Sequence, residues 1–345
     1  MTKNPNQMTS PGNAFDAILL ISFGGPEGMN EVLPFLENVL RGRNVPEERK
    51  LAVAEHYYLF GGVSPINEQN RKLIAALKEE LEACSVRLPI YWGNRNWHPL
   101  LADTVQQMAA DGIKNALAFV TSAYSSYSSC RQYLENISSA QASSRLSAPR
   151  IQKIRAFYNH PAFIKVNSER VQTAFERIPP AQRRDVELVF TAHSIPVSMA
   201  QNCSYQAQLL ETARLVATSV GHSRWRLAFQ SRSGAPNQPW LGPDILDCLK
   251  DLKGSGTRDV LVAPIGFVSD HLEVVYDLDV EAQRLASELG INLVRASTAG
   301  TDPAFVAMVR ELIFERIEPG TCPRFLGALG ASPDVCAPDC CLPRD

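Results

Sequence analysis

Short apolar runs that end in glycine, proline or polar residues recur along most of this chain. They occupy residues 17–25, 88–94, 115–124, 150–159, 186–196, 225–231, 259–270 and 291–297. Runs of this length are typical of strands buried in a parallel sheet. Amphipathic helical patterns fill most of the intervals, at 28–42, 68–84, 100–111, 161–178, 205–220, 243–254 and 278–289. The alternation of strand and helix predicts an α/β fold with parallel sheets.

The strand and helix pattern is repeated within the chain. Residues 96–129 and 238–271 each contain an aromatic residue with a proline, then a helical pattern, a glycine turn, a strand and a polar loop. The runs at 17–26 and 186–196 are also similar to each other. We therefore expect a duplicated α/β unit whose halves meet near 150–165.

Length and charge narrow the class of protein. At roughly 150 residues per domain, 345 residues suggest two domains. The net charge of −2 excludes a general binder of nucleic acid or other polyanions. No apolar run approaches the ~18 residues of a membrane span. The polar N-terminus lacks the apolar core of a secretory signal, so we expect a cytoplasmic protein.

Parallel sheets bind ligands outside the carboxyl ends of their strands. The loops to consider are 23–26, 121–133, 191–196, 230–240 and 267–277. His193 lies in the first part of the TAHSIP motif, directly after an apolar run. A histidine there can act as a base or a metal ligand near neutral pH. The alternative is a strand-end histidine that bonds only to a backbone carbonyl.

Three carboxylates, Glu273, Asp277 and Glu281, follow the apolar run at 259–270 at intervals of four residues. On a helix each interval rotates by only about 40°, so they would share one stripe. Like charges at this spacing cost roughly 0.2–0.5 kcal/mol per pair, which predicts a bound cation. A solvated acidic face is the alternative. His193 and Glu273 together form a nitrogen and oxygen set that suits Fe²⁺.

Aromatic residues gather beside the predicted loops. Clefts for flat apolar ligands are lined by aromatic side chains with a few polar groups. The candidates are Tyr57, Tyr58, Phe60, Tyr124, Tyr127, Tyr133 and Trp240. Ordinary core packing is the alternative for each of them. Arg41 begins a polar segment at 41–58 that either binds ligand carboxylates or lies in solvent.

From about Asp16 to Ile317 the chain resembles the ferrochelatase family. The motifs that carry the resemblance are SFGGPEGMNEV, FGGVSPINEQ, YWGNRNWHP, TAHSIP, PWLGP and FVSDHLEVVYDLDVEA. The resemblance implies two Rossmann-like, chelatase-type domains, each a four-stranded parallel sheet flanked by helices. The expected limits are a disordered lead-in at 1–15, halves at 16–155 and 156–318, and a cysteine-rich tail at 319–345. It further implies an enzyme of haem biosynthesis that inserts Fe²⁺ into a porphyrin in the interdomain cleft, with transient contacts to neighbouring haem-pathway enzymes.

The resemblance also assigns residues. His193 and Glu273 match the paired catalytic groups, and with Asp277 and Glu281 they form the metal-handling set. The positions that would contact the porphyrin are Ser64, Tyr133, Tyr57, Arg41 and Trp240. One departure is Phe23, where some relatives have a tyrosine that can face the metal. Phenylalanine cannot be a ligand there.

The polar segment at 41–58 bears on the choice of porphyrin. Relatives that act on protoporphyrin IX often have an apolar lip at the mouth of the cleft. A polar mouth better tolerates the four propionates of coproporphyrin III, which we expect as the substrate. The alternatives are protoporphyrin IX, another tetrapyrrole with cobalt or nickel, and a tetrapyrrole or metal carrier without catalysis.

Four of the eight cysteines lie in the last 24 residues. Clustered cysteines without a secretory signal favour a metal or redox role. Some ferrochelatases hold a [2Fe–2S] cluster with one internal and three C-terminal cysteines, and Cys130 lies in the matching internal loop. Three ligands would come from the tail, which contains Cys322, Cys336, Cys340 and Cys341. Cys340 and Cys341 are adjacent in sequence, so Cys322 can replace one of them. A structural zinc site or free thiols are the alternatives.

Overall fold

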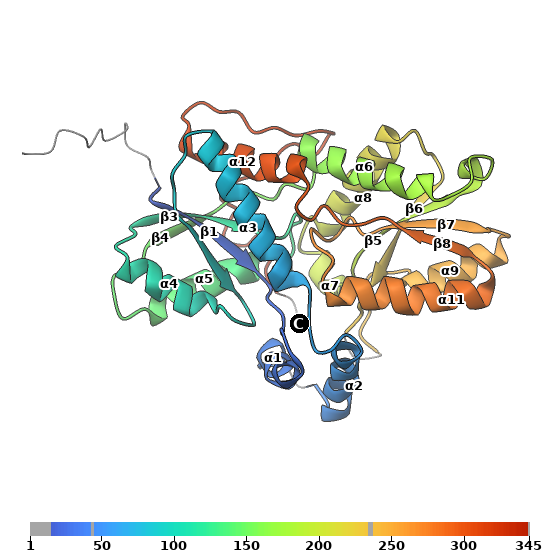
Figure 1. The fold of residues 1–345 in the computed structure, drawn as a ribbon, viewed down its shortest axis with the longest axis horizontal. Helices are drawn as coiled ribbons and strands as arrows, with labels where there is room; N and C mark the ends of the chain where they lie inside the picture. The colour runs from blue at the N-terminus through green and yellow to red at the C-terminus, as the bar shows by residue number, and fades with distance from the viewer. Residues whose placement is uncertain (1–14, 43–44, 234–236, 344–345) are drawn as a thin grey trace, which may run out of the picture.

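Two parallel sheets form the frame of the protein. The computed structural model describes residues 15–42, 45–233 and 237–343, and within them each sheet has four strands. The strand orders are β2-β1-β3-β4 and β6-β5-β7-β8, so the second sheet repeats the order of the first (Figure 1). The predicted duplicated α/β fold is confirmed. Most of the predicted lead-in, residues 1–14, lies outside the described residues.

Each predicted apolar run contains a strand. The first sheet comprises β1 (Ala17–Ser22), β2 (Ile90–Asn94), β3 (Asn115–Val120) and β4 (Arg150–Lys153). The second comprises β5 (Glu187–His193), β6 (Trp225–Gln230), β7 (Asp259–Ala263) and β8 (Asn292–Arg295). Most strands end before their runs do, because the last residues of those runs form the loops at the carboxyl edge.

Helices cover both faces of each sheet. The first half contains η1 (Met29–Glu31), α1 (Val32–Val39), α2 (Glu47–Tyr58), α3 (Ile66–Ala83), α4 (Leu101–Ala110), η2 (Tyr127–Arg131) and α5 (Gln132–Ser143). In the second half lie α6 (Pro161–Glu176), η3 (Arg183–Asp185), α7 (Val197–Ala200), α8 (Tyr205–Ser219), α9 (Ile245–Gly254), α10 (Leu272–Val274), η4 (Val275–Ala282), α11 (Gln283–Leu289) and α12 (Pro303–Ile317).

Some segments differ from the sequence prediction. Residues 41–58, expected as a short polar mouth, contain helix α2, so Tyr57 and Tyr58 lie on a helix and not at a loop edge. The expected loop 121–133 contains η2, a π-helix, and Tyr133 is the second residue of α5. Helix α12 was not predicted. It packs between α3 and α6, no residue from 304 to 317 is exposed, and apolar residues occur all around it, so it shows no one-sided apolar stripe.

One aromatic core joins the two halves. Phe119 and Phe157 stack with ring centroids 5.4 Å apart, and Phe163 and Phe305 close around them. Tyr124 follows β3 and donates a hydrogen bond of 2.8 Å to the carbonyl of Ile265, which follows β7. Tyr124 is therefore a core residue and not a loop-edge one. Each such ring stabilises the fold by about 1.5–3 kcal/mol, so the carboxyl-edge loops of the two sheets are held together firmly.

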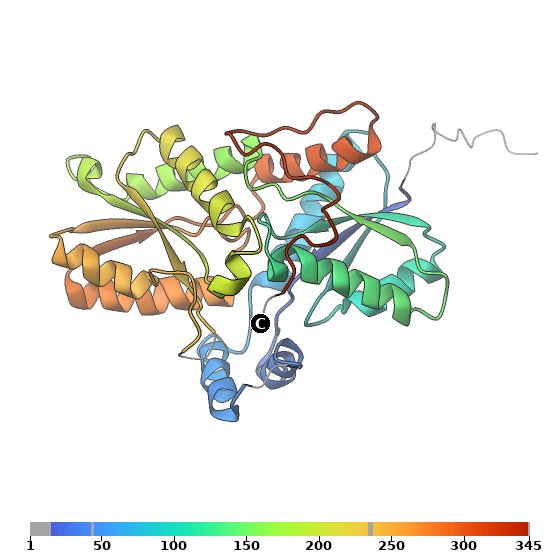
Figure 2. The same cartoon turned by 180° about the vertical axis from the view of Figure 1, so that it is seen from behind.

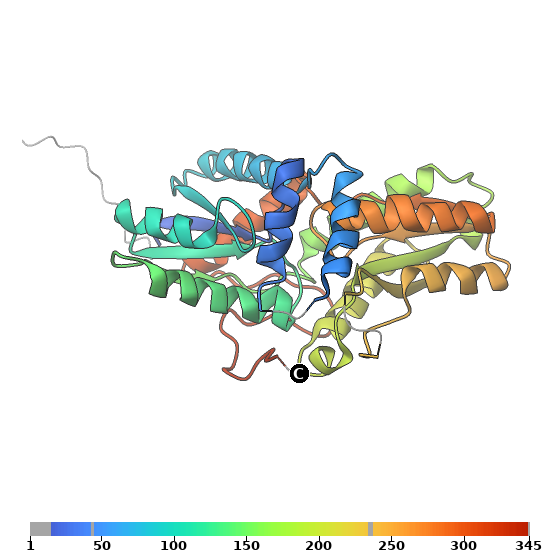
Figure 3. The same cartoon turned by 90° about the horizontal axis from the view of Figure 1, so that it is seen from below.

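Helices α1 and α2 form a lip below the gap between the sheets (Figures 1 and 3). Their own small core contains Phe35, Ala54 and Tyr57, together with Leu272 from the second half. The lip therefore belongs to the first half in sequence but also packs on the start of α10.

The chain after α12 runs back over both halves (Figure 2). The amide of Leu326 donates to the carbonyl of Asn159, whose side chain donates to the carbonyls of Leu326 and Gly330. Further along, Arg131 of the first half donates to the carbonyl of Pro338 at 2.8 Å. The tail is thus fixed to the junction between the halves. No helix in the described part of the chain is long and apolar enough to cross a membrane.

Candidate functional site

His193 is the last residue of β5, where the strand reaches the carboxyl edge of its sheet. Its Nδ1 contacts the carbonyl oxygen of Ser194, and its backbone carbonyl accepts a 3.0 Å hydrogen bond from Tyr205. Because a carbonyl can only accept, Nδ1 carries the proton in the neutral ring. Nε2 then presents a lone pair, and about a third of the side chain is exposed. The ring is held in place while one nitrogen stays available.

Glu273 comes from the loop after β7, the strand beside β5. His271 caps this short helix by accepting a 3.2 Å hydrogen bond from the amide of Glu273. The carboxylate oxygen Oε2 then lies 3.6 Å from His193 Nε2. Neighbouring strands of one sheet thus bring the two side chains together.

The carboxylates of Asp277 and Glu281 continue from Glu273 along η4, which is a π-helix over residues 275–282. Burial, and then the charges of Glu273 and Glu281, raise the pKa of Asp277 to about 7. Burial also raises the pKa of Glu281. The predicted stripe of carboxylates is therefore a close group, but the helix that carries it has the wider i→i+5 hydrogen bonding.

Two side chains with no predicted role, Gln230 and Ser231, hold the Asp277 carboxylate. Gln230 Nε2 donates to Asp277 Oδ2 at 3.2 Å, and the Ser231 hydroxyl donates to the same oxygen. Ser231 has a φ of 61°, a left-handed conformation that is strained for a non-glycine residue. Gln230 Oε1 is buried and has no hydrogen-bond partner among the described residues. Gln230 ends β6 and Ser231 follows it, and this position at the carboxyl edge was the available signal.

Two of the predicted ligand contacts lie beside the histidine and carboxylate pair. Tyr57 is buried in the lip core, and both burial and the charge of Glu273 raise its pKa. Trp240 is bridged to Pro196 in the loop that follows His193. Arg41 lies apart from them, exposed after α1, and bonds to Asn38. The structure therefore brings Tyr57 close to Glu273 and pairs the backbone of Trp240 with the loop after His193, whereas the described contacts of Arg41 include neither His193 nor Glu273.

The two remaining predicted contacts, Ser64 and Tyr133, also lie in the first half. Ser64 is buried and its amide donates to the carbonyl of Pro26 at 2.8 Å. The Arg95 guanidinium lies 5.7 Å from the ring of Phe23 and 5.5 Å from that of Tyr133. Tyr133 is 5% exposed and packs in the core of the first sheet. Arg95, which had no predicted role, thus contacts both Tyr133 and Phe23.

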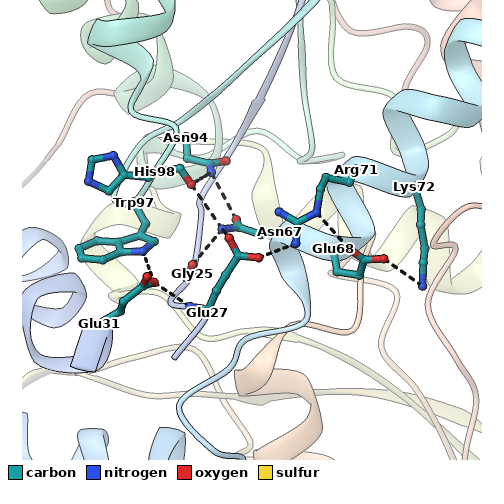
Figure 4. A network of polar contacts seen from close by, with 10 residues as sticks. All are labelled: Gly25, Glu27, Glu31, Asn67, Glu68, Arg71, Lys72, Asn94, Trp97 and His98. Carbon is teal, nitrogen blue, oxygen red and sulfur yellow. Dashed lines mark hydrogen bonds and ion pairs between the residues drawn. The ribbon is translucent and has the colours of Figure 1, made fainter. Parts of the chain in front are cut away.

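A polar network fixes the loop that carries Phe23 and Gly25 (Figure 4). The side-chain amide of Asn67 donates to the carbonyl of Gly25 at 3.0 Å and to Glu27. Asn94 donates to Asn67 and to the carbonyl of His98. The network ties the loops after β1 and β2 to helix α3 and so fixes their position relative to this helix.

Four cysteines gather around a second place. Cys130, Cys336, Cys340 and Cys341 line one cavity of about 60 Å³, and the sulfur atoms of Cys340 and Cys341 are 3.5 Å apart. Burial raises the pKa of Cys336 to about 11 and also raises that of Cys341. Among the described residues no three His, Cys, Asp or Glu side chains already stand in ligating positions. Cys322 is exposed and is not among the residues that line the cavity.

The first site can accept a proton at His193 Nε2 and pass a proton or a cation along hard oxygen ligands. Carboxylate oxygens and an imidazole nitrogen suit a first-row divalent metal. The buried carboxyl of Asp277 gains or loses its proton close to neutral pH. The arrangement therefore fits chemistry in which a metal enters as protons leave.

Comparisons with known proteins agree with this geometry. The ferrochelatase family model matches residues 15–317. A protein described as ferrochelatase from Rhodopirellula baltica is 54% identical, with 95% of this chain and 93% of the relative covered. A protein described as coproporphyrin III ferrochelatase from Nocardia farcinica is 49% identical, with 96% and 97% covered.

Solved structures show the same architecture. The sirohydrochlorin chelatase SirB from Bacillus subtilis subspecies spizizenii, in complex with cobalt, superposes with a TM-score of 0.51 at 11% identity. The match covers 88% of this chain and 96% of SirB. At that identity the likeness concerns the fold alone.

Replacement of Asp277 by asparagine is expected to stabilise the protein more at pH 8 than at pH 5. The pKa of this carboxyl is about 7 in the folded protein, above the ordinary value of the unfolded chain. The unfolded chain therefore holds fewer protons between these values, and the wild-type free energy of unfolding falls as pH rises. We expect the gain from asparagine to be ~2 kcal/mol larger at pH 8, measured by urea unfolding without divalent metal. Glu288→Gln, exposed on α11, is the control, and an equal gain at both pH values would contradict the raised pKa.

Proposed function

The chain belongs to the ferrochelatase family, enzymes that insert iron into a porphyrin in haem biosynthesis, and we propose that its porphyrin is coproporphyrin III. The motif-based assignment to the family is thereby confirmed. Two observations support the choice of porphyrin. The relative from Nocardia farcinica carries that substrate in its name. Helix α2 at the mouth begins with the charged sequence Glu47-Glu48-Arg49-Lys50, which leaves a polar edge for propionates.

We infer that His193 is the base for the pyrrole protons. The observation that carries this role is the 3.6 Å separation of His193 Nε2 and Glu273 Oε2. A porphyrin must lose two pyrrole protons as it gains the metal. Nε2 has the lone pair to accept a proton, and the adjacent carboxylate stabilises the imidazolium that forms. A carrier that only binds a tetrapyrrole needs no such pair.

Glu273, Asp277 and Glu281 form the proposed route for the Fe²⁺ substrate. Hard carboxylate oxygens replace water around the ion as it moves inward. Asp277 is held by Ser231 and Gln230, and its pKa of about 7 lets it release a proton when a cation arrives. Protons displaced from the macrocycle can leave along the same carboxylates.

The porphyrin would lie between the first-half wall and the His193 loop. Tyr57 and Trp240 provide apolar surface close to the catalytic pair, and Ser64 lies beside Gly25 in the opposite wall. Arg41 is exposed where it can pair with a propionate. Tyr133 acts through Arg95, which separates it from Phe23. Metal entry requires a bent macrocycle, and these contacts would provide the binding energy for that strain.

We propose that the cysteine cavity holds a [2Fe–2S] cluster. Such clusters are held by four thiolates, and Cys130, Cys336, Cys340 and Cys341 line one small cavity. Cys341 has a φ of 55° and is 2% exposed, a strained and buried position that suits a ligand. These four would hold the cluster, without Cys322. A bound cluster would supply an iron–sulfur redox centre that links the tail to η2. We further propose a cytoplasmic location and transient contacts with neighbouring haem-pathway enzymes.

Replacement of His193 by alanine is expected to lower kcat by ~10²–10⁴-fold, because the proton acceptor is lost. Porphyrin binding, measured by fluorescence quenching, should change little because the walls of the site remain. His222→Gln, remote from the site, should keep near-wild-type turnover. Turnover close to wild type in the alanine variant would exclude His193 as the essential base.

The porphyrin preference is expected to appear in kcat/KM under anaerobic conditions with Fe²⁺. The kcat/KM for coproporphyrin III should exceed that for protoporphyrin IX by more than about tenfold. Burying unpaired propionates in a closed apolar mouth would cost free energy, and an open polar mouth avoids that cost. Metalloporphyrin absorbance gives the rate for both substrates. A preference for protoporphyrin IX would overturn the proposed substrate while leaving the enzyme class intact.

Anaerobically isolated protein is expected to contain about two iron and two sulfide per chain, with visible absorption. Serine at Cys130, Cys336, Cys340 or Cys341 should remove both, whereas Cys322→Ser and Cys84→Ser should retain them. Metal and sulfide analysis decides the result. Zinc in place of iron, or loss of the cluster on replacing Cys322, would contradict this ligand set.

A further inference from the structure

One aromatic contact connects the lip to the acidic π-helix across the mouth of the site. His56 on α2 and Tyr276 on η4 stack with ring centroids 3.7 Å apart and planes at 12°. Burial lowers the pKa of His56. Figure 3 shows α2 beside the helix formed by α10, η4 and α11. The first half thus contacts the middle of the element that carries the carboxylates.

The acidic π-helix needs such support. A π-helix is rare and less favourable than an α-helix, and it occurs mostly as a short insertion at functional sites. Here it also carries two of three carboxylates that repel one another: Asp277 and Glu281 lie on η4, Glu273 lies just before it, and the charges of Glu273 and Glu281 raise the pKa of Asp277. Relaxation toward an α-helix would relieve both costs but would rotate the carboxylates relative to one another. Something outside the helix must oppose that change.

Polar contacts from other elements also hold this segment, both at its start and within η4, where Gln230 and Ser231 bond to Asp277. At the start, Gln69 of α3 exchanges two hydrogen bonds with the backbone of Asp270, at 3.0 and 3.1 Å. Arg295 of β8 pairs with Asp270 and Asp279. Tyr276 is next to Asp277, so the ring that stacks on it acts at the turn where the winding matters most.

We propose that His56 is a positioning residue for iron delivery: its ring, stacked on Tyr276 from the opposite half, keeps η4 in its π-helical winding and so keeps Glu273, Asp277 and Glu281 in one line. The inference rests on the proposed role of these carboxylates as the Fe²⁺ route. His56 touches neither the iron nor the porphyrin in this role. Its contribution is to the affinity for the cation and not to the proton transfer at His193.

Kinetics under anaerobic conditions test this role. His56→Ala should raise the KM for Fe²⁺ about fivefold, the size expected for loss of one well-stacked aromatic pair. The kcat at saturating iron and the KM for the porphyrin should stay within about twofold. His56→Phe keeps a ring and should restore the iron KM. Glu55→Ala, exposed on the same helix, is the matched control and should behave as wild type.

A binding measurement without turnover separates positioning from general damage. Mn²⁺ prefers carboxylates to thiols, so its electron paramagnetic resonance signal reports the carboxylate route and not the tail. His56→Ala and Tyr276→Ala should each weaken Mn²⁺ binding about fivefold, and the double variant should be no weaker, because both remove the same stack. His56→Leu, which fills the space without stacking, replaces the alanine variant if that one does not fold.

The outcomes distinguish the inference from the function it rests on. Asp277→Asn should also weaken Mn²⁺ binding, and if it does not, the carboxylates are not the route and both proposals fail. If Asp277→Asn weakens binding but His56→Ala does not, only the positioning role is overturned. Additive losses in the double variant, or an iron KM that phenylalanine does not restore, would likewise overturn it.

Discussion

The shared aromatic core between the two sheets is the constraint from which the site follows. Parallel sheets bind ligands at the carboxyl ends of their strands, but one sheet alone would line only one side of a ligand. Because Phe119, Phe157, Phe163 and Phe305 form one cluster, the carboxyl edges of both sheets are held toward a common space. The hydrogen bond from Tyr124 to Ile265 joins the two edges directly. Within the second sheet, adjacent β5 and β7 then bring His193 and Glu273 together.

The electrostatics of the site work against the stability of the fold. Buried carboxylates that repel one another would ordinarily be replaced or solvated. Here Gln230 and Ser231 donate hydrogen bonds to Asp277 and offset part of the free energy lost by burying its carboxylate. Ser231 itself adopts a strained backbone conformation. On the proposed Fe²⁺ route, a cation bound among these carboxylates would relieve the repulsion. Such local conflict between stability and arrangement is expected where residues are kept for function.

The sequence predicted the sheets well because buried strands and their turns leave a strong local pattern. It did not predict α2, which buries only Ala54 and Tyr57, or α12, which is buried on most sides and so lacks an apolar stripe. The carboxylate spacing correctly suggested a close group on a helix. The π-helical winding could not be predicted, because it depends on contacts made by distant residues. The roles of Gln230 and Ser231 could not be predicted for the same reason, because their hydrogen bonds to Asp277 form only when β6 and η4 pack together.

The tail shows how a weakly structured segment can be given a fixed place. It has few buried side chains of its own, so its position depends on polar contacts with Asn159, Glu211 and Arg131. Gly327 has a φ of 79°, and a Cβ there would collide with Glu211, so only glycine allows this approach. These contacts bring three tail cysteines to the cavity beside Cys130. Burial raises the pKa of Cys336 and Cys341, so ionising these two thiols costs free energy when the tail holds no metal. In the proposed cluster site, a bound metal would deprotonate its thiol ligands and stabilise the tail at the same time.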